Sequence, residues 1–99
     1  MVARIPIDRD MLAAFCRRNG IRRLALFGSV LRDDFRPDSD VDVLVEFLPG
    51  RTPGLKFFSM QDELTAMFGR EVDLNTPGFL SDSFRDEVMR EAEEQYVAA

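Results

Sequence analysis

Apolar residues recur along the chain with two different periods, and the places where the period changes predict the order of its elements. Residues 8–19 carry apolar side chains at helical spacing and are followed by Gly20, a common helix stop. The segment "VDVLVEF" at residues 41–47 alternates instead and is rich in β-branched residues, which is typical of a strand. Over the whole chain the pattern predicts helices at 8–19, 55–69 and 81–97 and strands at 21–28, 41–47 and 70–76.

These elements predict the α/β class, with a small mixed β-sheet flanked by about four helices in a single domain that spans residues 1–99. Along the strand at 41–47, Val41 and Val43 fall on one side and Asp42 and Leu44 on the other. The apolar positions of the second helix are predicted to pack in the core; they include Phe57, Phe58, Met60 and Met67.

The size and charge of the chain limit the functions it can have. At 99 residues it is expected to form one domain with a modest core. The formal net charge is −5 and the basic residues are scattered, so direct binding to nucleic acid is not expected. No apolar run approaches the ~20 residues that cross a bilayer, and no signal-like segment opens the chain. We therefore expect a cytoplasmic protein that does not bind a membrane.

The chain contains no histidine and one cysteine. The lack of histidine excludes histidine general bases, Ser-His-Asp or Cys-His nucleophiles and histidine-ligated zinc. Cys16 falls on the apolar side of the first predicted helix with Leu12 and Phe15, so it is interpreted as a packing residue. Any catalysis is therefore left to carboxylates, arginines, hydroxyls or a metal held by oxygen.

Two polar features flank the end of the first strand and the start of the second. Gly28 and Ser29 directly follow the strand at 21–28, where glycine permits close backbone approach and a serine hydroxyl can hold a phosphate. Asp40 and Asp42 are spaced i, i+2, so both project to one face of a strand. Such a pair is a suitable seat for Mg²⁺ and a nucleotide phosphate, although Asp-x-Asp and Gly-Ser are each common in ordinary turns.

A third carboxylate lies in the next predicted strand. In "EVDLN", Val72 and Leu74 take one face and Asp73 the other. If this strand neighbours the one at 41–47, Asp73 lies beside Asp40 and Asp42. The alternative is a solvated acid on an edge strand.

These residues carry a resemblance to a known family. The run "FGSVLRDDFRPDSDVDVLVEF", followed by "GLKFFSMQDELTAMFGREVDLNT", resembles the minimal nucleotidyltransferases, MNT-type relatives of the polymerase-β superfamily. Members of this family pair with HEPN proteins as toxin–antitoxin systems. The resemblance extends from about Arg22 through the C-terminal helix and implies a single-domain nucleotidyltransferase fold.

The resemblance implies a role for each residue of the motifs. Gly28, Ser29, Arg32 and Ser39 would bind the nucleotide, with the triphosphate held at Gly28 and Ser29. Arg32 matches the arginine of the family's Gly-Ser-x-x-Arg-Gly pattern, and a guanidinium can fork onto two phosphate oxygens. The chain departs from the pattern at Asp33, where the family has glycine, and this places another negative charge near the triphosphate.

The carboxylates would hold the metal. Asp40 and Asp42 would ligate Mg²⁺, and Asp73 would ligate a second ion or act as the general base on the acceptor hydroxyl. By resemblance, the chain would transfer AMP from ATP to a tyrosine hydroxyl of a HEPN ribonuclease toxin, with which it forms a hetero-oligomer, and so neutralise it.

Two other functions are compatible with the same fold. The chain could neutralise the toxin by forming a stoichiometric complex without chemistry, which would not require the three carboxylates. It could also transfer a nucleotide to a small molecule, as the antibiotic adenylyltransferases of the superfamily do with the help of an additional domain. A protein acceptor, which brings its own surface, fits the short chain better.

Overall fold

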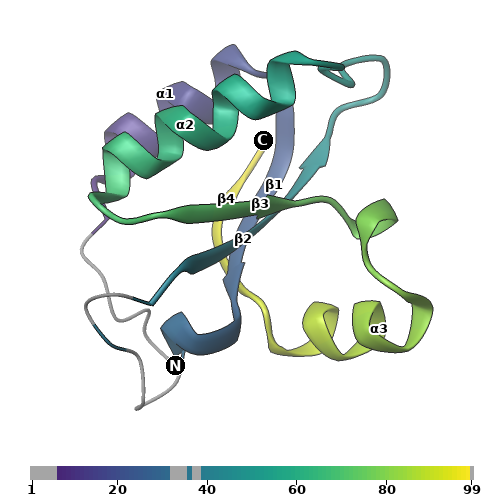
Figure 1. Cartoon of the computed structure of the whole chain (residues 1–99). Helices are drawn as coiled ribbons and strands as arrows, with labels where there is room; N and C mark the ends of the chain where they lie inside the picture. Colours follow the sequence, from purple (N-terminus) through teal and green to yellow (C-terminus); the bar gives the residue numbers. More distant parts are fainter. Residues whose placement is uncertain (1–6, 32–35, 37–38, 99) are drawn as a thin grey trace.

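The computed structural model describes residues 7–31, 36 and 39–98, which form one mixed sheet with helices on both sides (Figure 1). The order of strands in the sheet is β3-β2-β1-β4, with β1 antiparallel to both β2 and β4, and β2 parallel to β3. The elements are α1 (Arg9–Arg18), β1 (Ile21–Phe27), the 3₁₀ turn η1 (Gly28–Leu31), β2 (Val41–Phe47), α2 (Lys56–Phe68), β3 (Val72–Asn75), η2 (Pro77–Phe79), α3 (Asp82–Glu91) and β4 (Glu93–Val97).

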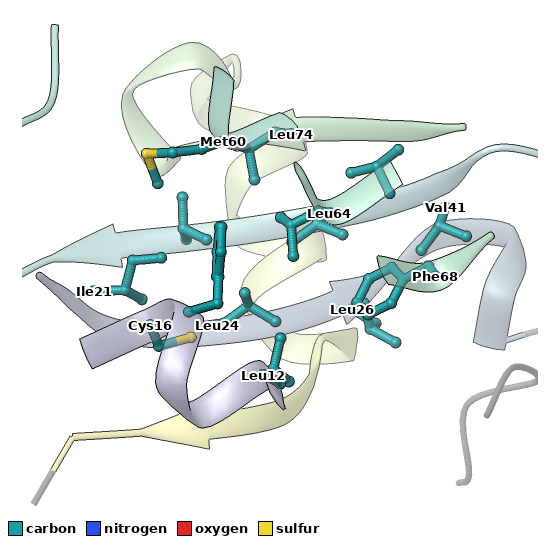
Figure 2. Packing of buried hydrophobic residues seen from close by; sticks show 14 of the residues in the cluster. Leu12, Cys16, Ile21, Leu24, Leu26, Val41, Met60, Leu64, Phe68 and Leu74 are labelled. Carbon is teal, nitrogen blue, oxygen red and sulfur yellow. The ribbon is translucent and has the colours of Figure 1, made fainter. Parts of the chain in front are cut away.

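The predicted fold class is confirmed, and the two faces of the sheet are covered unequally. Helices α1 and α2 lie together on one face, where the larger core forms, and α3 lies on the other side (Figures 1 and 2). The larger core takes Leu12 and Phe15 from α1, Met60 and Leu64 from α2, and the valines of β2. On the opposite face a small cluster joins Phe27, Leu44 and Val88. The predicted alternation of β2 is therefore confirmed, and among the described residues α3 is the helix that packs on the second face.

Edge strand β3 is attached to α2 by side-chain hydrogen bonds. The backbone N–H of Val72 donates to Oγ1 of Thr65 at 3.0 Å, and the N–H of Leu74 donates to Oε1 of Gln61 at 2.9 Å. These two donors alternate with Asp73 along the strand, so both neighbours of Asp73 are held in place. The helix thus satisfies donors that an edge strand would otherwise expose.

The C-terminal segment differs from the prediction. The helix expected at 81–97 ends at Glu91, and residues Glu93–Val97 form β4. Local spacing favours a helix here, but β1 has a second edge of unpaired backbone groups, and β4 satisfies them by antiparallel pairing. Tyr96, which pairs with Leu24 and packs against the larger core, adds burial that a continued helix would not supply. The described residues therefore contain three α-helices and a four-stranded sheet, where about four helices were expected.

Core packing is confirmed for most of the predicted positions of α2 but not for Phe58. Met60 is buried, and Phe57 and Met67 are partly buried against the core, whereas Phe58 is 65% exposed. Consecutive residues of a helix point about 100° apart, so Phe57 and Phe58 cannot both face the sheet. Their rings meet edge to face, with 6.3 Å between centroids.

The interpretation of Cys16 as a packing residue is confirmed. Its side chain is fully buried in the larger core, and burial raises the pKa of the thiol to about 12. A thiol that stays protonated at neutral pH is a poor nucleophile. None of the helices in the described part of the chain is both long and apolar enough to cross a bilayer.

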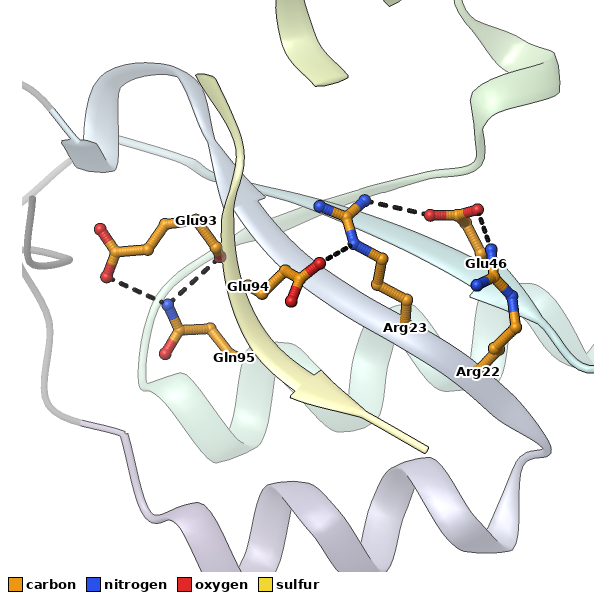
Figure 3. Close-up of polar contacts among 6 residues, drawn as sticks. All are labelled: Arg22, Arg23, Glu46, Glu93, Glu94 and Gln95. Carbon is orange, nitrogen blue, oxygen red and sulfur yellow. Dashed lines mark hydrogen bonds and ion pairs between the residues drawn. The ribbon is translucent and has the colours of Figure 1, made fainter. Parts of the chain in front are cut away.

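Arg23 joins three strands on the face of the sheet away from α1 and α2 (Figure 3). Its guanidinium donates to Oε1 of Glu94 on β4 at 2.7 Å and to Oε2 of Glu46 on β2 at 3.0 Å. Arg22 pairs with the other oxygen of Glu46. The Arg23 side chain is only 14% exposed. Burial would lower the pKa of Arg23, but the hydrogen bonds from the two glutamates outweigh it and raise that pKa above its usual value.

Replacing Arg23 by methionine is expected to lower the free energy of unfolding by about 2 kcal/mol, because the Glu46 carboxylate, whose side chain is 19% exposed, loses a largely buried partner and the exposed Glu94 loses the same one. Urea denaturation would measure the change. Arg18→Met is the matched control, since the Arg18–Glu63 pair is exposed on both sides and is expected to contribute less than about 1 kcal/mol. Equal losses in the two variants would show that the Arg23 network adds no more than a surface ion pair.

Candidate active site

The start of β2 brings two of the predicted acidic residues together. Asp42 is half-buried on the face of the sheet that carries Phe27 and Leu44. In the parallel pairing of β2 with β3, Asp42 lies directly opposite Asp73. Both residues alternate with core-facing neighbours, so their side chains share one face. The tertiary structure therefore places two carboxylates side by side on adjacent strands.

Gly28 lies against the carboxylate of Asp42. In the antiparallel pairing of β1 with β2, Phe27 is opposite Asp42, so the next residue, Gly28, begins its turn beside that side chain. A Cβ atom added at Gly28 would overlap Oδ2 of Asp42 and come within 3.2 Å of its Cγ. The backbone of Gly28 also has φ of +77°, a conformation that residues with a Cβ rarely adopt. Both features require glycine at this position.

The turn after Gly28 is anchored from the other side of the sheet. Val30 and Leu31, the last residues of η1, are buried in the larger core. Ser29 belongs to the same 3₁₀ turn, so its backbone directly follows the glycine that contacts Asp42. Arg32 and Asp33 lie outside the described residues. The turn predicted to hold phosphate is therefore fixed at its first residue by Asp42 and at its end by apolar burial.

Asp40 is exposed and immediately precedes β2. The next residue, Val41, donates its N–H to the carbonyl of Glu71 at 2.9 Å, which begins the pairing with β3. Ser39 makes two hydrogen bonds with Arg36: its N–H donates to the carbonyl at 3.0 Å, and its Oγ accepts from the N–H at 3.1 Å. The predicted nucleotide residue Ser39 thus shapes the segment that leads to Asp40.

A further residue reaches this segment. Nη1 of Arg70 donates to the carbonyl of Arg36 at 2.9 Å. No motif in the sequence marks Arg70 as part of the site. The one feature of the sequence that could have pointed to Arg70 is its position just before the strand that carries Asp73.

The donors at this end of the sheet suit Mg²⁺, which binds carboxylate oxygens and usually keeps several waters. Asp42 and Asp73 are in register, and Asp40 precedes Asp42 by two residues. Across residues 7–31, 36 and 39–98, however, no three acidic side chains stand close enough to form a metal-binding group. The chemistry of the residues therefore fits the metal, whereas the complete set of ligands is not assembled in this arrangement.

A pocket of about 590 Å³ opens at the other end of β2. It is lined mainly by apolar residues and glycines of the segment from Val45 to Phe57, together with Thr76 and Pro77. Glu46 is the only ionisable residue in its lining. Because paired carboxylates are absent from this lining, the start of β2 is the better candidate for nucleotide chemistry.

A small mixed sheet with a glycine turn packed against a strand aspartate is the arrangement of a nucleotidyltransferase domain. The match of residues 9–96 to the model of the family described as "Nucleotidyltransferase domain" agrees with this class. The chain belongs to this family.

One curated relative and one solved structure are similar to this chain over most of its length. Protein adenylyltransferase MntA of Thermococcus cleftensis is 38% identical over 76 residues, which cover 75% of this chain and 74% of the relative. A solved structure assigned as a minimal nucleotidyltransferase is 38% identical, with a TM-score of 0.71 and 85% of each chain covered.

Two toxin–antitoxin structures share the fold. One contains AMP-PNP; it is 17% identical, with a TM-score of 0.74, and 93% of this chain and 75% of that chain are covered. The other is a tri-AMPylated HEPN toxin of Shewanella oneidensis in complex with MNT antitoxin. The matched chain of that structure is 17% identical, with a TM-score of 0.66, and 91% of this chain and 70% of the matched chain are covered.

Proposed function

We propose that this chain is an antitoxin that transfers AMP from ATP to a tyrosine hydroxyl of a HEPN-type ribonuclease toxin and thereby neutralises it. The observation that carries the proposal is the contact of Gly28 with the carboxylate of Asp42, in register with Asp73. The similarity to a protein adenylyltransferase supports the reaction, and the shared fold with an antitoxin bound to an AMPylated HEPN toxin supports the kind of acceptor.

The reaction needs no covalent intermediate on the protein. The tyrosine Oη forms a bond to the α-phosphorus of ATP, the bond from that phosphorus to the bridging oxygen breaks, and pyrophosphate leaves. The proton of the hydroxyl passes to Asp73, if Asp73 acts as the general base rather than as a second metal ligand. Rate acceleration then depends mainly on position and on charge neutralisation.

The residues of the site divide these tasks. The backbone amide groups at Gly28 and Ser29 receive the triphosphate, as in other glycine-containing turns. Arg32 and Ser39 complete the nucleotide site. Asp40 and Asp42 would hold Mg²⁺, which would neutralise the charge that develops on the phosphates.

The test is intact-mass spectrometry of a HEPN-type protein, the kind of partner proposed, after incubation with the chain, ATP and Mg²⁺. We expect the partner to gain the mass of one or more AMP units. A partner in which the acceptor tyrosine is replaced by phenylalanine should lose that gain and serves as the control. If the two proteins form a tight complex that suppresses the ribonuclease while the mass stays unchanged, the chain acts by stoichiometric inhibition and the proposed transfer is wrong.

A further inference from the structure

Strand pairing does not account for the position of Asp40. Asp42 and Asp73 are placed by strand pairing and by the contact with Gly28. Asp40 is exposed and lies just outside β2, so strand pairing does not orient it directly. Its placement depends on what holds the residues before it, and among the described ones these are Arg36 and Ser39.

The carbonyl of Arg36 accepts two hydrogen bonds from different parts of the chain. One comes from the N–H of Ser39 at 3.0 Å and the other from Nη1 of Arg70 at 2.9 Å. The N–H of Arg36 in turn donates to Oγ of Ser39. The bond from Arg70 is charge-assisted and links residues 34 positions apart in the sequence. Through this bond the α2–β3 connection contacts Arg36.

The backbone on both sides of Arg70 is anchored. Gly69 ends α2 in the left-handed conformation, with its N–H donating to the carbonyl of Thr65 at 3.0 Å. On the other side, the carbonyl of Glu71 accepts from Val41 at 2.9 Å, and the N–H of Val72 donates to Thr65. Arg70 therefore extends its side chain from a fixed point beside the start of β2.

We propose that Arg70 is a positioning residue, which holds the Arg36 carbonyl and through it Ser39, so that Asp40 stands beside Asp42 for divalent-metal binding. The catalytic consequence rests on the proposed function, whereas the effect on metal affinity does not. Removing the guanidinium would leave Ser39 as the remaining described donor to the Arg36 carbonyl, and Asp40 would sample more orientations. Loss of a group that orients a metal ligand typically reduces metal affinity about 10–100-fold.

The test compares Arg70→Ala with Arg51→Ala. Arg51 also donates to a backbone carbonyl, that of Arg18 at 3.4 Å, but it lies in the loop between β2 and α2, away from the start of β2, so it is a matched control. Binding of Mn²⁺ to each protein without nucleotide is measured by the loss of the free-ion electron paramagnetic resonance signal. Hydrogen exchange of the Ser39 amide is followed in the same samples. We expect Arg70→Ala to bind Mn²⁺ at least about tenfold more weakly and to exchange Ser39 faster, with Arg51→Ala unchanged.

Arg70→Lys keeps the charge and one possible hydrogen bond, so it should restore part of the Mn²⁺ affinity. It also keeps the test valid if the alanine variant folds poorly. In the transfer assay, Arg70→Ala should need a higher Mg²⁺ concentration than the native chain to reach its half-maximal rate. At saturating Mg²⁺ its rate should largely recover.

The outcomes separate this inference from the proposed function. If the native chain transfers AMP but Arg70→Ala and Arg70→Lys match Arg51→Ala in Mn²⁺ affinity and Ser39 exchange, Arg70 does not position the site. If the native chain transfers nothing while Mn²⁺ affinity still falls in Arg70→Ala, the positioning role holds and the proposed reaction does not.

Discussion

Alanine at both Asp40 and Asp42 is expected to lower the rate of AMP transfer at least about 10³-fold, because metal-borne charge stabilisation contributes several kcal/mol to such a reaction. The fold should persist. Asp40 is exposed and Asp42 is half-buried, and removing two like charges from one face relieves repulsion. The free energy of unfolding should stay within about 1 kcal/mol of the native value. AMP incorporation into the partner and urea denaturation would measure the two quantities.

The control variant loses the same amount of charge at two positions on the helices. Asp62→Ala combined with Asp86→Ala removes two exposed carboxylates from the middle of α2 and α3 and should leave transfer unchanged. Transfer retained by the Asp40 and Asp42 double variant would exclude these residues as the metal ligands. Binding to the partner is a separate measurement: a variant that binds and still neutralises the toxin without transferring AMP would favour stoichiometric inhibition.

Gly28→Ala is expected to lower transfer about 10²-fold or more, since a displacement of about 1 Å at a reacting group can have an effect of that size. The added Cβ would overlap Oδ2 of Asp42 and push the carboxylate out of place. The variant should also lose roughly 1–2 kcal/mol in free energy of unfolding, because φ of +77° is unfavourable for alanine. Steady-state transfer rates and urea denaturation would report the two effects.

Gly50→Ala separates the backbone strain from the steric overlap. Gly50 has the same φ of +77°, yet a Cβ there would meet nothing within 4 Å. It should therefore show the backbone cost alone and keep its transfer rate. If both glycine variants lose transfer equally, the contact between Gly28 and Asp42 is not what the reaction requires.

Local patterns were sufficient for several features of the site. The alternation of β2 placed Asp42 on the face of the strand away from the core-facing valines. The same alternation in β3 placed Asp73 on the face away from Val72 and Leu74. These predictions depend only on the period of two along a strand, which any short segment displays. The same kind of pattern misassigned Phe58, because helical spacing does not say which of two adjacent phenylalanines turns toward the sheet.

The sequence by itself determined the class of the fold, the faces of the two acidic strands, the buried role of Cys16 and the resemblance that identified the motifs. Only the tertiary structure decided that Asp73 lies opposite Asp42, that Gly28 contacts the Asp42 carboxylate, that Glu93–Val97 form a strand and that Arg70 reaches Arg36. The physical reason is the range of the interactions involved. Periodicity reports contacts within one element, whereas register, edge pairing and long side-chain hydrogen bonds join residues far apart in the chain, and their geometry is set only when the sheet assembles.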